Sequence, residues 1–313
     1  MDILSDILSL LEIKGTLYFR TSFRFPWGVE VPAYKNVARF HLAHRGDSWF
    51  QVEGSEDEIH LEQGDLIIFP HGASHTLRGQ RGARIDTLDH VVEESGFTGK
   101  GVLVYGGNEI PESEVQLICG HLAFGENADH PLLGELPPYI HLKKGDEISN
   151  TWLDVTLKML GSVAGRAQPG SDLIATKLAE IIFTQTVRSF LTSKEANRLV
   201  FRGLKDPQIS RLLGELHKNY KATWSLEEMA RVAGMSRTVF AERFKELMGM
   251  TPMQYLTNWR MQKARQRLTE SKEPVIRVAE ESGYQSEAAF ARAFKQYFDV
   301  GPATYRKDHQ EAA

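Results

Sequence analysis

Two short stretches, 50 residues apart, carry side chains of the kinds that contact nucleic-acid bases. Their candidate contact residues are Ser236, Arg237, Thr238, Glu242 and Lys245 in the first stretch, and Ser286, Glu287, Ala288, Arg292 and Lys295 in the second. Arginine bonds to two guanine acceptors, glutamate accepts from cytosine, and small residues contact the thymine methyl group. We expect both stretches to read double-stranded DNA, with Arg292 the first candidate for a base contact. For any single residue, contact with water or phosphate alone stays open.

An internal repeat positions these residues. Six identical pairs recur at a fixed offset, namely Ser236/Ser286, Phe240/Phe290, Phe244/Phe294, Lys245/Lys295, Pro252/Pro302 and Tyr255/Tyr305. A period of this length indicates a duplicated supersecondary unit. In each copy a first helix ends just before a turn glycine, Gly234 or Gly283, and a serine then caps a second helix. The four-residue spacing of the phenylalanines buries one face of that helix and leaves the polar face free. The pattern predicts two helix-turn-helix units.

The stretch from about Leu212 to Tyr305 resembles the DNA-binding domain of the AraC family of regulators. The resemblance rests on WSLEEMARVAGMSRTVFAERFKELMGMTPMQYL and GYQSEAAFARAFKQYFDVGPATYR. It implies that the two second helices enter successive major grooves, and that the protein activates transcription in contact with RNA polymerase. It also implies a long connecting helix over TNWRMQKARQRL, whose basic residues we expect to face phosphate. These residues are Arg260, Lys263, Arg265 and Arg267.

The charge distribution indicates that the C-terminal part of the chain binds a polyanion. The net charge is −4, but residues 205–313 hold 18 Lys and Arg against 14 Asp and Glu, whereas the rest holds 19 against 27. An acidic N-terminal part and a basic C-terminal part indicate that only the C-terminal part binds DNA. The single cysteine suits a reducing compartment. With no apolar run of membrane-spanning length and no signal-peptide pattern at the start, we expect a cytoplasmic protein without a membrane segment.

The front of the chain has the pattern of a β-barrel. Short alternating runs between Gly15 and Leu122 are separated by Gly, Pro and Asp, which predicts many short strands. Within them, GDLIIFPHGASH resembles the second cupin motif, whose turn would direct His75 into the barrel. The first cupin motif is incomplete: His41 and His44, three apart on a strand, point to opposite faces, and the expected glutamate is missing.

The incomplete first cupin motif favours a ligand-binding sensor over an enzyme. We predict no catalytic residue, no metal site and no obligatory cofactor. The segment LICGHLAFGENADHPLLGELP resembles one in regulators that pair a cupin-like sensor with an AraC-type tail, which implies that the barrel binds a small-molecule effector. A metal-dependent cupin enzyme with an accessory helical domain is the alternative interpretation. Cys119 and His121 lie two apart and share a strand face. They are either buried structural residues or zinc ligands.

Arg20 and Arg24 are the predicted effector ligands. They lie four apart on an expected strand and so share a face, where two guanidinium groups can hold phosphates. The R-x-x-x-R pattern resembles the first motif of PilZ domains, which implies cyclic di-GMP as candidate effector, although the partner motif is missing. The alternative is a pair of surface arginines with carboxylate partners.

The predicted fold class is multidomain: an N-terminal cupin-like β-barrel with helices, followed by an all-α tandem helix-turn-helix. We expect residues 1–150 to form the sensor, residues 151–206 a helical dimerisation segment and linker, and residues 207–313 the DNA-binding domain. The segment from Ser171 to Leu191 has more apolar positions than one buried stripe requires, including Phe183 and Val187. It therefore predicts a homodimer.

Overall fold

The chain folds as two units that do not follow the sequence consecutively. A computed structural model describes residues 2–99, 101–107, 114–125, 130–145, 152–163, 168–193 and 199–310. Residues 13–126 and 136–193 form one unit, here called the barrel unit. Residues 1–12, 127–135 and 194–313 form the other, here called the helical unit. The predicted division at residues 150 and 206 is consecutive, whereas the structure assigns two early segments to the helical unit.

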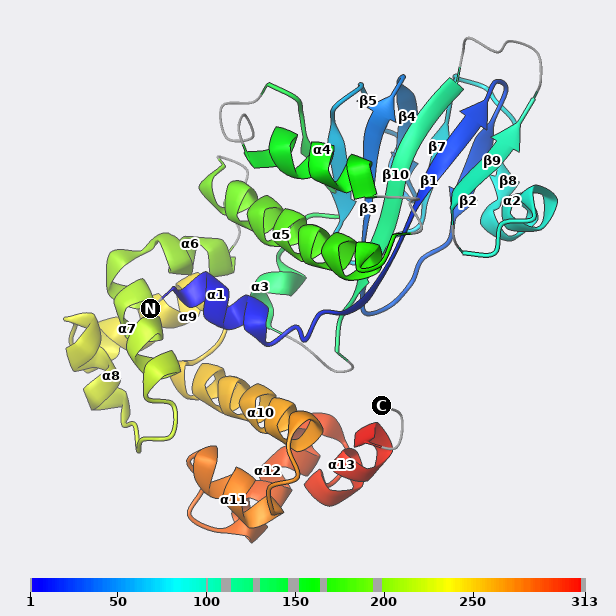
Figure 1. The fold of residues 1–313 in the computed structure, drawn as a ribbon. Helices are drawn as coiled ribbons and strands as arrows, with labels where there is room; N and C mark the ends of the chain where they lie inside the picture. The colour runs from blue at the N-terminus through cyan, green and yellow to red at the C-terminus, as the bar shows by residue number, and fades with distance from the viewer. Residues whose placement is uncertain are drawn as a thin grey trace. The chain divides into compact units, whose positions relative to one another are not determined.

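The predicted strands form two sheets in the barrel unit (Figure 1). One sheet has the order β11-β6-β3-β10-β1-β9 and the other the order β5-β4-β7-β2-β8. The strands are β1 (Lys14–Arg24), β2 (Gly28–Val31), β3 (Val37–Arg45), β4 (Ser48–Val52), β5 (Glu58–Leu61), β6 (Leu66–Phe69), β7 (His75–Arg78), β8 (Asp86–Thr87), β9 (Val102–Gly106), β10 (Glu114–Ala123) and β11 (Ile140–Leu142). The sheets pack face to face around a core that includes Trp27, Phe50 and Phe69.

The turn before β7 requires glycine. Gly72 has φ +63°, and a Cβ at this position would overlap the carbonyl oxygen of Tyr34. Only a residue without a side chain fits such a left-handed and crowded position. The turn leads into His75, which is 1% exposed inside the barrel unit, as the cupin-like motif predicts.

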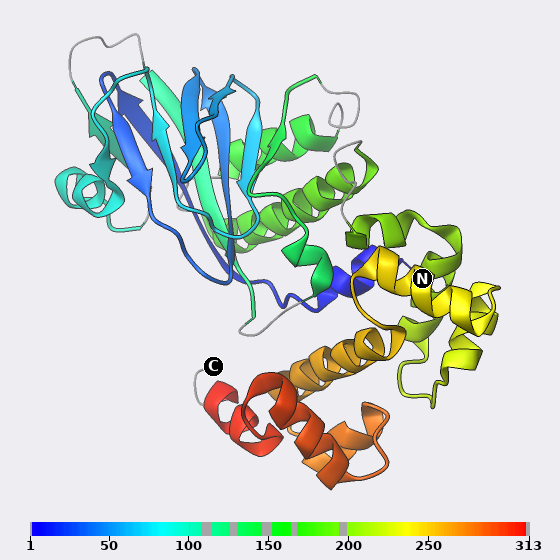
Figure 2. The same ribbon diagram turned by 180° about the vertical axis from the view of Figure 1, so that it is seen from behind.

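Three helices belong to the barrel unit. Helix α2 (Leu88–Ser95) packs against β2, β8 and β9, while α4 (Trp152–Val163) and α5 (Ser171–Thr192) pack against each other. Figures 1 and 2 place α4 and α5 on the outer face of the six-stranded sheet. Phe183 and Val187 of α5 are buried within the unit, so they do not form the free apolar face that the sequence suggested. The packing of the barrel unit already uses them.

The tandem helix-turn-helix prediction is confirmed in the helical unit. Its elements are α1 (Ile3–Ser9), α3 (Pro131–Gly134), α6 (Leu199–Lys205), α7 (Pro207–Lys218), α8 (Leu226–Ala233), α9 (Arg237–Met248), α10 (Pro252–Glu270), α11 (Val275–Glu281), α12 (Glu287–Phe298) and α13 (Pro302–Gln310). The turn glycines Gly234 and Gly283 have φ +70° and +80°. Ser286 accepts a hydrogen bond from the amide of Ala289, whereas Ser236 stands at the N-cap without a side-chain bond. Among the described helices, none has the length and apolar character that crossing a bilayer needs.

Candidate functional sites: a paired-helix surface and a barrel cavity

Helices α9 and α12 each bury one face and expose the other. Phe240, Phe244, Phe290 and Phe294 are completely buried, as their four-residue spacing predicts. The opposite faces carry the predicted contact residues, all of which are exposed: Ser236, Arg237, Thr238, Glu242, Lys245, Ser286, Glu287, Ala288, Arg292 and Lys295. Since the buried rings fix the rotation of each helix about its axis, the same polar positions point outward in both copies.

The two exposed faces differ in charge at equivalent positions. Glu242 of α9 and Arg292 of α12 lie at the same place in the repeat, at the centre of each outer face. Arg237 pairs with Glu227 at 3.0 Å, whereas Arg292 and Lys295 have no ion-pair partner among the described residues. One helix thus presents a hydrogen-bond acceptor where the other presents a donor.

Helix α10 connects the two copies, and its basic residues are used inside the helical unit. Arg260 donates to the carbonyl oxygens of Tyr220 and Ala222, both at 2.8 Å. Lys263 is half-buried, with its Nζ 5.5 Å from the ring centre of Trp259. Desolvation by burial lowers the pKa of Lys263. A phosphate contact of Arg260 or Lys263 stays a prediction, since the structure shows only their contacts within the protein.

The other two basic residues of α10 are also paired. Arg267 binds Glu273 at 2.9 Å. Arg265 is 1% exposed and pairs with Glu12 at 3.1 Å, so the expectation that it faces phosphate is wrong. A long arginine can point either way from a helix, and its partner lies near the start of the chain, where the repeat gives no information.

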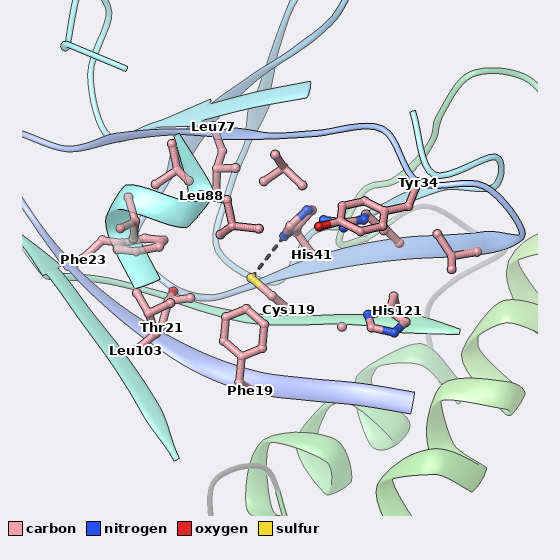
Figure 3. A pocket seen from close by; sticks show the side chains of 16 residues that line it. Phe19, Thr21, Phe23, Tyr34, His41, Leu77, Leu88, Leu103, Cys119 and His121 are labelled. Atoms are coloured by element: carbon pink, nitrogen blue, oxygen red, sulfur yellow. Dashed lines mark hydrogen bonds between the residues drawn. The ribbon is translucent and has the colours of Figure 1, made fainter. Parts of the chain in front are cut away.

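A cavity of about 260 Å³ lies in the barrel unit, between the two sheets and against α2. Its walls are mostly apolar, and polar groups gather on β3 and β10 (Figure 3). The lining residues are Phe19, Thr21, Phe23, Val29, Val31, Tyr34, Val37, Arg39, His41, Leu77, Leu88, Val91, Leu103, Cys119, Gly120 and His121. A concave apolar space with a few convergent polar groups is the usual form of a small-molecule site.

A chain of hydrogen bonds runs from the cavity wall into the core. Cys119 Sγ lies 3.1 Å from His41 Nδ1, and His41 Nε2 lies 2.8 Å from His75 Nε2. His75 Nδ1 lies 2.8 Å from the carbonyl oxygen of Ala73 and must therefore donate. With both rings neutral, this fixes every proton: His75 donates to Ala73, His41 donates to His75, and the Cys119 thiol donates to His41.

Burial keeps this chain uncharged. It lowers the pKa of His75 to about 4 and that of His41 well below its ordinary value, and it raises the pKa of the Cys119 thiol. Among the described residues, no group of three His, Cys, Asp or Glu side chains is placed to hold a metal ion. His44 faces away from the cavity, where its Nε2 lies 3.4 Å from an Arg20 nitrogen. Cys119 and His121 share the cavity face, as their spacing predicts.

Arg39 supplies positive charge to this apolar cavity. Its guanidinium lies 4.2 Å from the ring centre of Tyr34, and its Nε is buried without a hydrogen-bond partner. Desolvation lowers the pKa of Arg39, which nevertheless stays a cation near neutral pH. The sequence interpretation missed both Tyr34 and Arg39. The available signal was the spacing of Arg39 two residues before His41, which places the two on one strand face.

The predicted ligands Arg20 and Arg24 lie outside the cavity. Phe19, Thr21 and Phe23 line it, so the alternate residues of β1 point to the other face of the sheet. Arg20 and Arg24 share one face of β1, as predicted. That face is the outer face of the sheet and not the one that lines the cavity. A ligand bound by this pair would lie on the surface of the sheet.

Comparison with known proteins finds a matching family for each of the two parts of the chain that carry these sites. The family described as "Cupin" matches residues 2–192, and the family described as "Helix-turn-helix domain" matches residues 229–308. A "Putative AraC-like transcription regulator" of Streptomyces lividans is 30% identical over 310 residues, covering 98% of each chain. The "RCS-specific HTH-type transcriptional activator RclR" of Escherichia coli is 25% identical, with all of both chains covered. The solved DNA-binding domain of AdpA with a target DNA is 29% identical over 34% of this chain and 96% of that chain, with a TM-score of 0.33. No comparison supports a relation to PilZ domains.

The neutral histidines predict a pH-dependent stability. Because the folded pKa of His75 lies below its unfolded value of about 6.5, its contribution is complete above pH 6.5 and is lost as the pH falls toward 4. The loss amounts to roughly 3 kcal/mol at most. Urea unfolding of the wild type should show this decline, and His75→Gln should make it shallower. His90→Gln, on the exposed face of α2, should leave the slope unchanged; equal slopes in all three proteins would contradict the assignment.

Proposed function

The chain belongs to the AraC-like transcription regulators that carry an N-terminal cupin domain, and from this premise we propose that an effector in the barrel cavity controls promoter binding by α9 and α12. The chain is a DNA-binding regulator, as are the relatives that span it. The alternative of a metal-dependent cupin enzyme is set aside because those relatives are named as regulators.

The outer faces of α9 and α12 are the proposed base-reading surfaces. Arg292 can donate to both guanine acceptors, and Glu242 can accept from the cytosine amino group. Because the two residues take equivalent places in the repeat, the two helices should read different bases at equivalent positions of their half-sites. Lys245 and Lys295, one turn further along, are the proposed phosphate contacts.

The effector we propose is a small organic acid with an apolar body. The observation that carries this proposal is Arg39, a cation with a free buried Nε in the wall of a mostly apolar cavity. A carboxylate would accept from Arg39, and the phenyl and aliphatic walls would surround the rest of the ligand. The cavity volume lies just below the ~300–1,000 Å³ typical of ligand pockets, which favours a small molecule over a dinucleotide.

Cyclic di-GMP is the second candidate effector, and it would use the outer pair instead. It carries two phosphates, and Arg20 and Arg24 provide two guanidinium groups on one face of β1. The cavity, in contrast, is lined by a single arginine.

Activation and dimerisation complete the proposal. The activator named among the relatives supports activation. Contact with RNA polymerase is part of the same proposal. Helices α4 and α5 carry five large apolar side chains that are between 46% and 65% exposed: Val155, Met159, Leu173, Ile174 and Ile181. We propose that a second copy of the chain covers them, since such a surface is costly to leave in water.

Arg292→Ala should weaken binding to the preferred site by ~1–3 kcal/mol and relax specificity at one base pair. Glu242→Ala should relax specificity at a different position. Competition binding across a library of duplexes measures both effects. Arg277→Ala, an exposed arginine on the first helix of the same repeat copy, is the matched control. A uniform loss on all sequences in Arg292→Ala would show that this residue contacts only phosphate.

Arg39→Met should weaken effector binding to the barrel about tenfold or more. Calorimetry against a panel of small aromatic and aliphatic carboxylates should give at least one ligand for the wild type. Losing a charge-assisted bond worth ~1.5–3 kcal/mol weakens binding about tenfold or more. Arg20→Ala and Arg24→Ala serve as controls and should bind like the wild type. Heat with cyclic di-GMP that is lost in these two variants, and retained in Arg39→Met, would move the effector site to the outer face.

Ile174→Glu and Ile181→Glu should shift the protein from dimer to monomer in sedimentation at micromolar concentration, because a buried unpaired charge opposes association. Val104→Glu is the matched control, since Val104 is an equally exposed apolar residue, at 44%, but lies on the edge strand β9 instead of α4 or α5. This variant should stay dimeric. A wild-type protein that is monomeric with and without effector would refute the dimer.

A further inference from the structure

The first twelve residues of the chain are an integral part of the helical unit. Helix α1 packs against α7, and both views place it beside α3 (Figures 1 and 2). Ile7, Leu10 and Leu11 are completely buried. The amphipathic pattern of this segment predicts such burial but does not say against what. Nothing in a helix-turn-helix repeat requires a segment from the opposite end of the chain.

One end of this segment is fastened to the second half of α10. The Arg265 guanidinium donates to the carbonyl oxygen of Leu10 at 2.7 Å and pairs with the Glu12 carboxylate at 3.1 Å. The Arg265 and Glu12 side chains are only 1% and 4% exposed. Glu12 also has φ +45°, a left-handed conformation that L-residues rarely adopt and that the surrounding contacts must hold. A buried pair that loses one charge leaves the other uncompensated, so this contact tolerates little change.

The other end packs against α7, which in turn packs on the first helix-turn-helix. His217 Nδ1 of α7 lies 3.4 Å from the Asp6 carboxylate, and its Nε2 lies 2.8 Å from the hydroxyl of Tyr255. His130 Nδ1 accepts from the amide of Leu132, so its Nε2 donates to the same hydroxyl, at 3.2 Å. The Tyr255 proton is then directed to His217, whose Nδ1 keeps the remaining proton and lies near the Asp6 carboxylate without a hydrogen bond to it. His217 also stacks on Trp259, with ring centres 3.5 Å apart.

These two attachments lie on different halves of the DNA-binding apparatus. Asp6 contacts α7, which packs on α8 of the first copy. Arg265 lies in the part of α10 whose neighbours Met261, Ala264 and Leu268 form a core with Phe290 and Phe294 of the second copy. Residues 6–12 therefore run from α7, which packs on the first copy, to the part of α10 that packs on the second.

We propose that residues 6–12 are a brace that sets the separation of α9 and α12, with Asp6 and Glu12 as positioning residues for DNA binding. They do not touch DNA. They hold α10 against α7, and α10 carries the second recognition helix. Successive major grooves recur at the helical repeat of DNA, so two recognition helices bind together only at a matching separation. The proposal rests on the proposed DNA binding by α9 and α12 and goes beyond it, since it needs no effector and no assignment of single base contacts.

A role limited to stability makes a different prediction from a positioning role. Loss of stability lowers the amount of active protein and weakens binding to every duplex by the same factor. Loss of positioning weakens binding only where both half-sites must be occupied together, and it removes the preference for one spacing between them.

The test uses the full chain and a duplex selected by the wild type from a random pool. Two further duplexes derive from it, one with a base pair inserted between the half-sites and one with a half-site scrambled. Glu12→Gln should lose about tenfold or more on the intact duplex, should lose the preference for native over lengthened spacing, and should bind the scrambled duplex within about twofold of wild type. Glu270→Gln, an exposed carboxylate on the same helix as Arg265, is the matched control and should behave like the wild type.

Tyr255→Phe keeps the buried ring and removes the hydroxyl that joins His130 and His217, so it should show the same pattern in smaller degree. If Glu12→Gln does not fold, as judged by circular dichroism, Tyr255→Phe tests the proposal in its place. Unchanged spacing preference in a folded variant would overturn the proposal. An equal loss on all three duplexes would also overturn it, because that pattern belongs to stability alone.

Discussion

The ion pair between Arg265 and Glu12 is the contact on which the arrangement of the helical unit most depends. A guanidinium that is 1% exposed must have its charge and donors matched inside the protein, and the matching groups come from the first twelve residues. The start of the chain is thereby bound to α10. Helix α10 also packs against α8, α9 and α12. The contact therefore holds the helix that connects the two helix-turn-helix copies.

The barrel unit follows a different physical rule, the alternation of side chains along a strand. On β1 this alternation turns Phe19 and Thr21 toward the cavity and Arg20 and Arg24 outward. On β3 the same alternation brings Arg39 and His41 to the cavity. His41 and His75 form a neutral chain with Cys119, so the cavity's charge comes from Arg39. An apolar space with one cation is selective for a single anionic group, which is the basis of the proposed effector class.

Two of the four places where the chain passes between the units adjoin strands that line the cavity. Glu12, which holds Arg265, lies two residues before β1, and β10 leads toward the segment that contains His130. The two strands are neighbours in the sheet, with Phe19 opposite Cys119. Two segments of the helical unit are thus continuous along the chain with strands of the cavity wall.

Local patterns in the sequence determined much of the secondary structure and the burial of individual side chains in this protein. The 50-residue repeat predicted both helix-turn-helix units, their turn glycines and the buried phenylalanines, because capping and helical periodicity act over a few residues. The motif around Gly72 predicted the inward placement of His75 for the same reason. The sequence did not reveal that Arg265 is buried, that Phe183 and Val187 pack within the barrel unit, or that Arg39 and Tyr34 form a pair. Periodicity states which side of an element a residue occupies, but the neighbour that covers this side comes from a distant part of the chain, and only the tertiary structure decides which one it is.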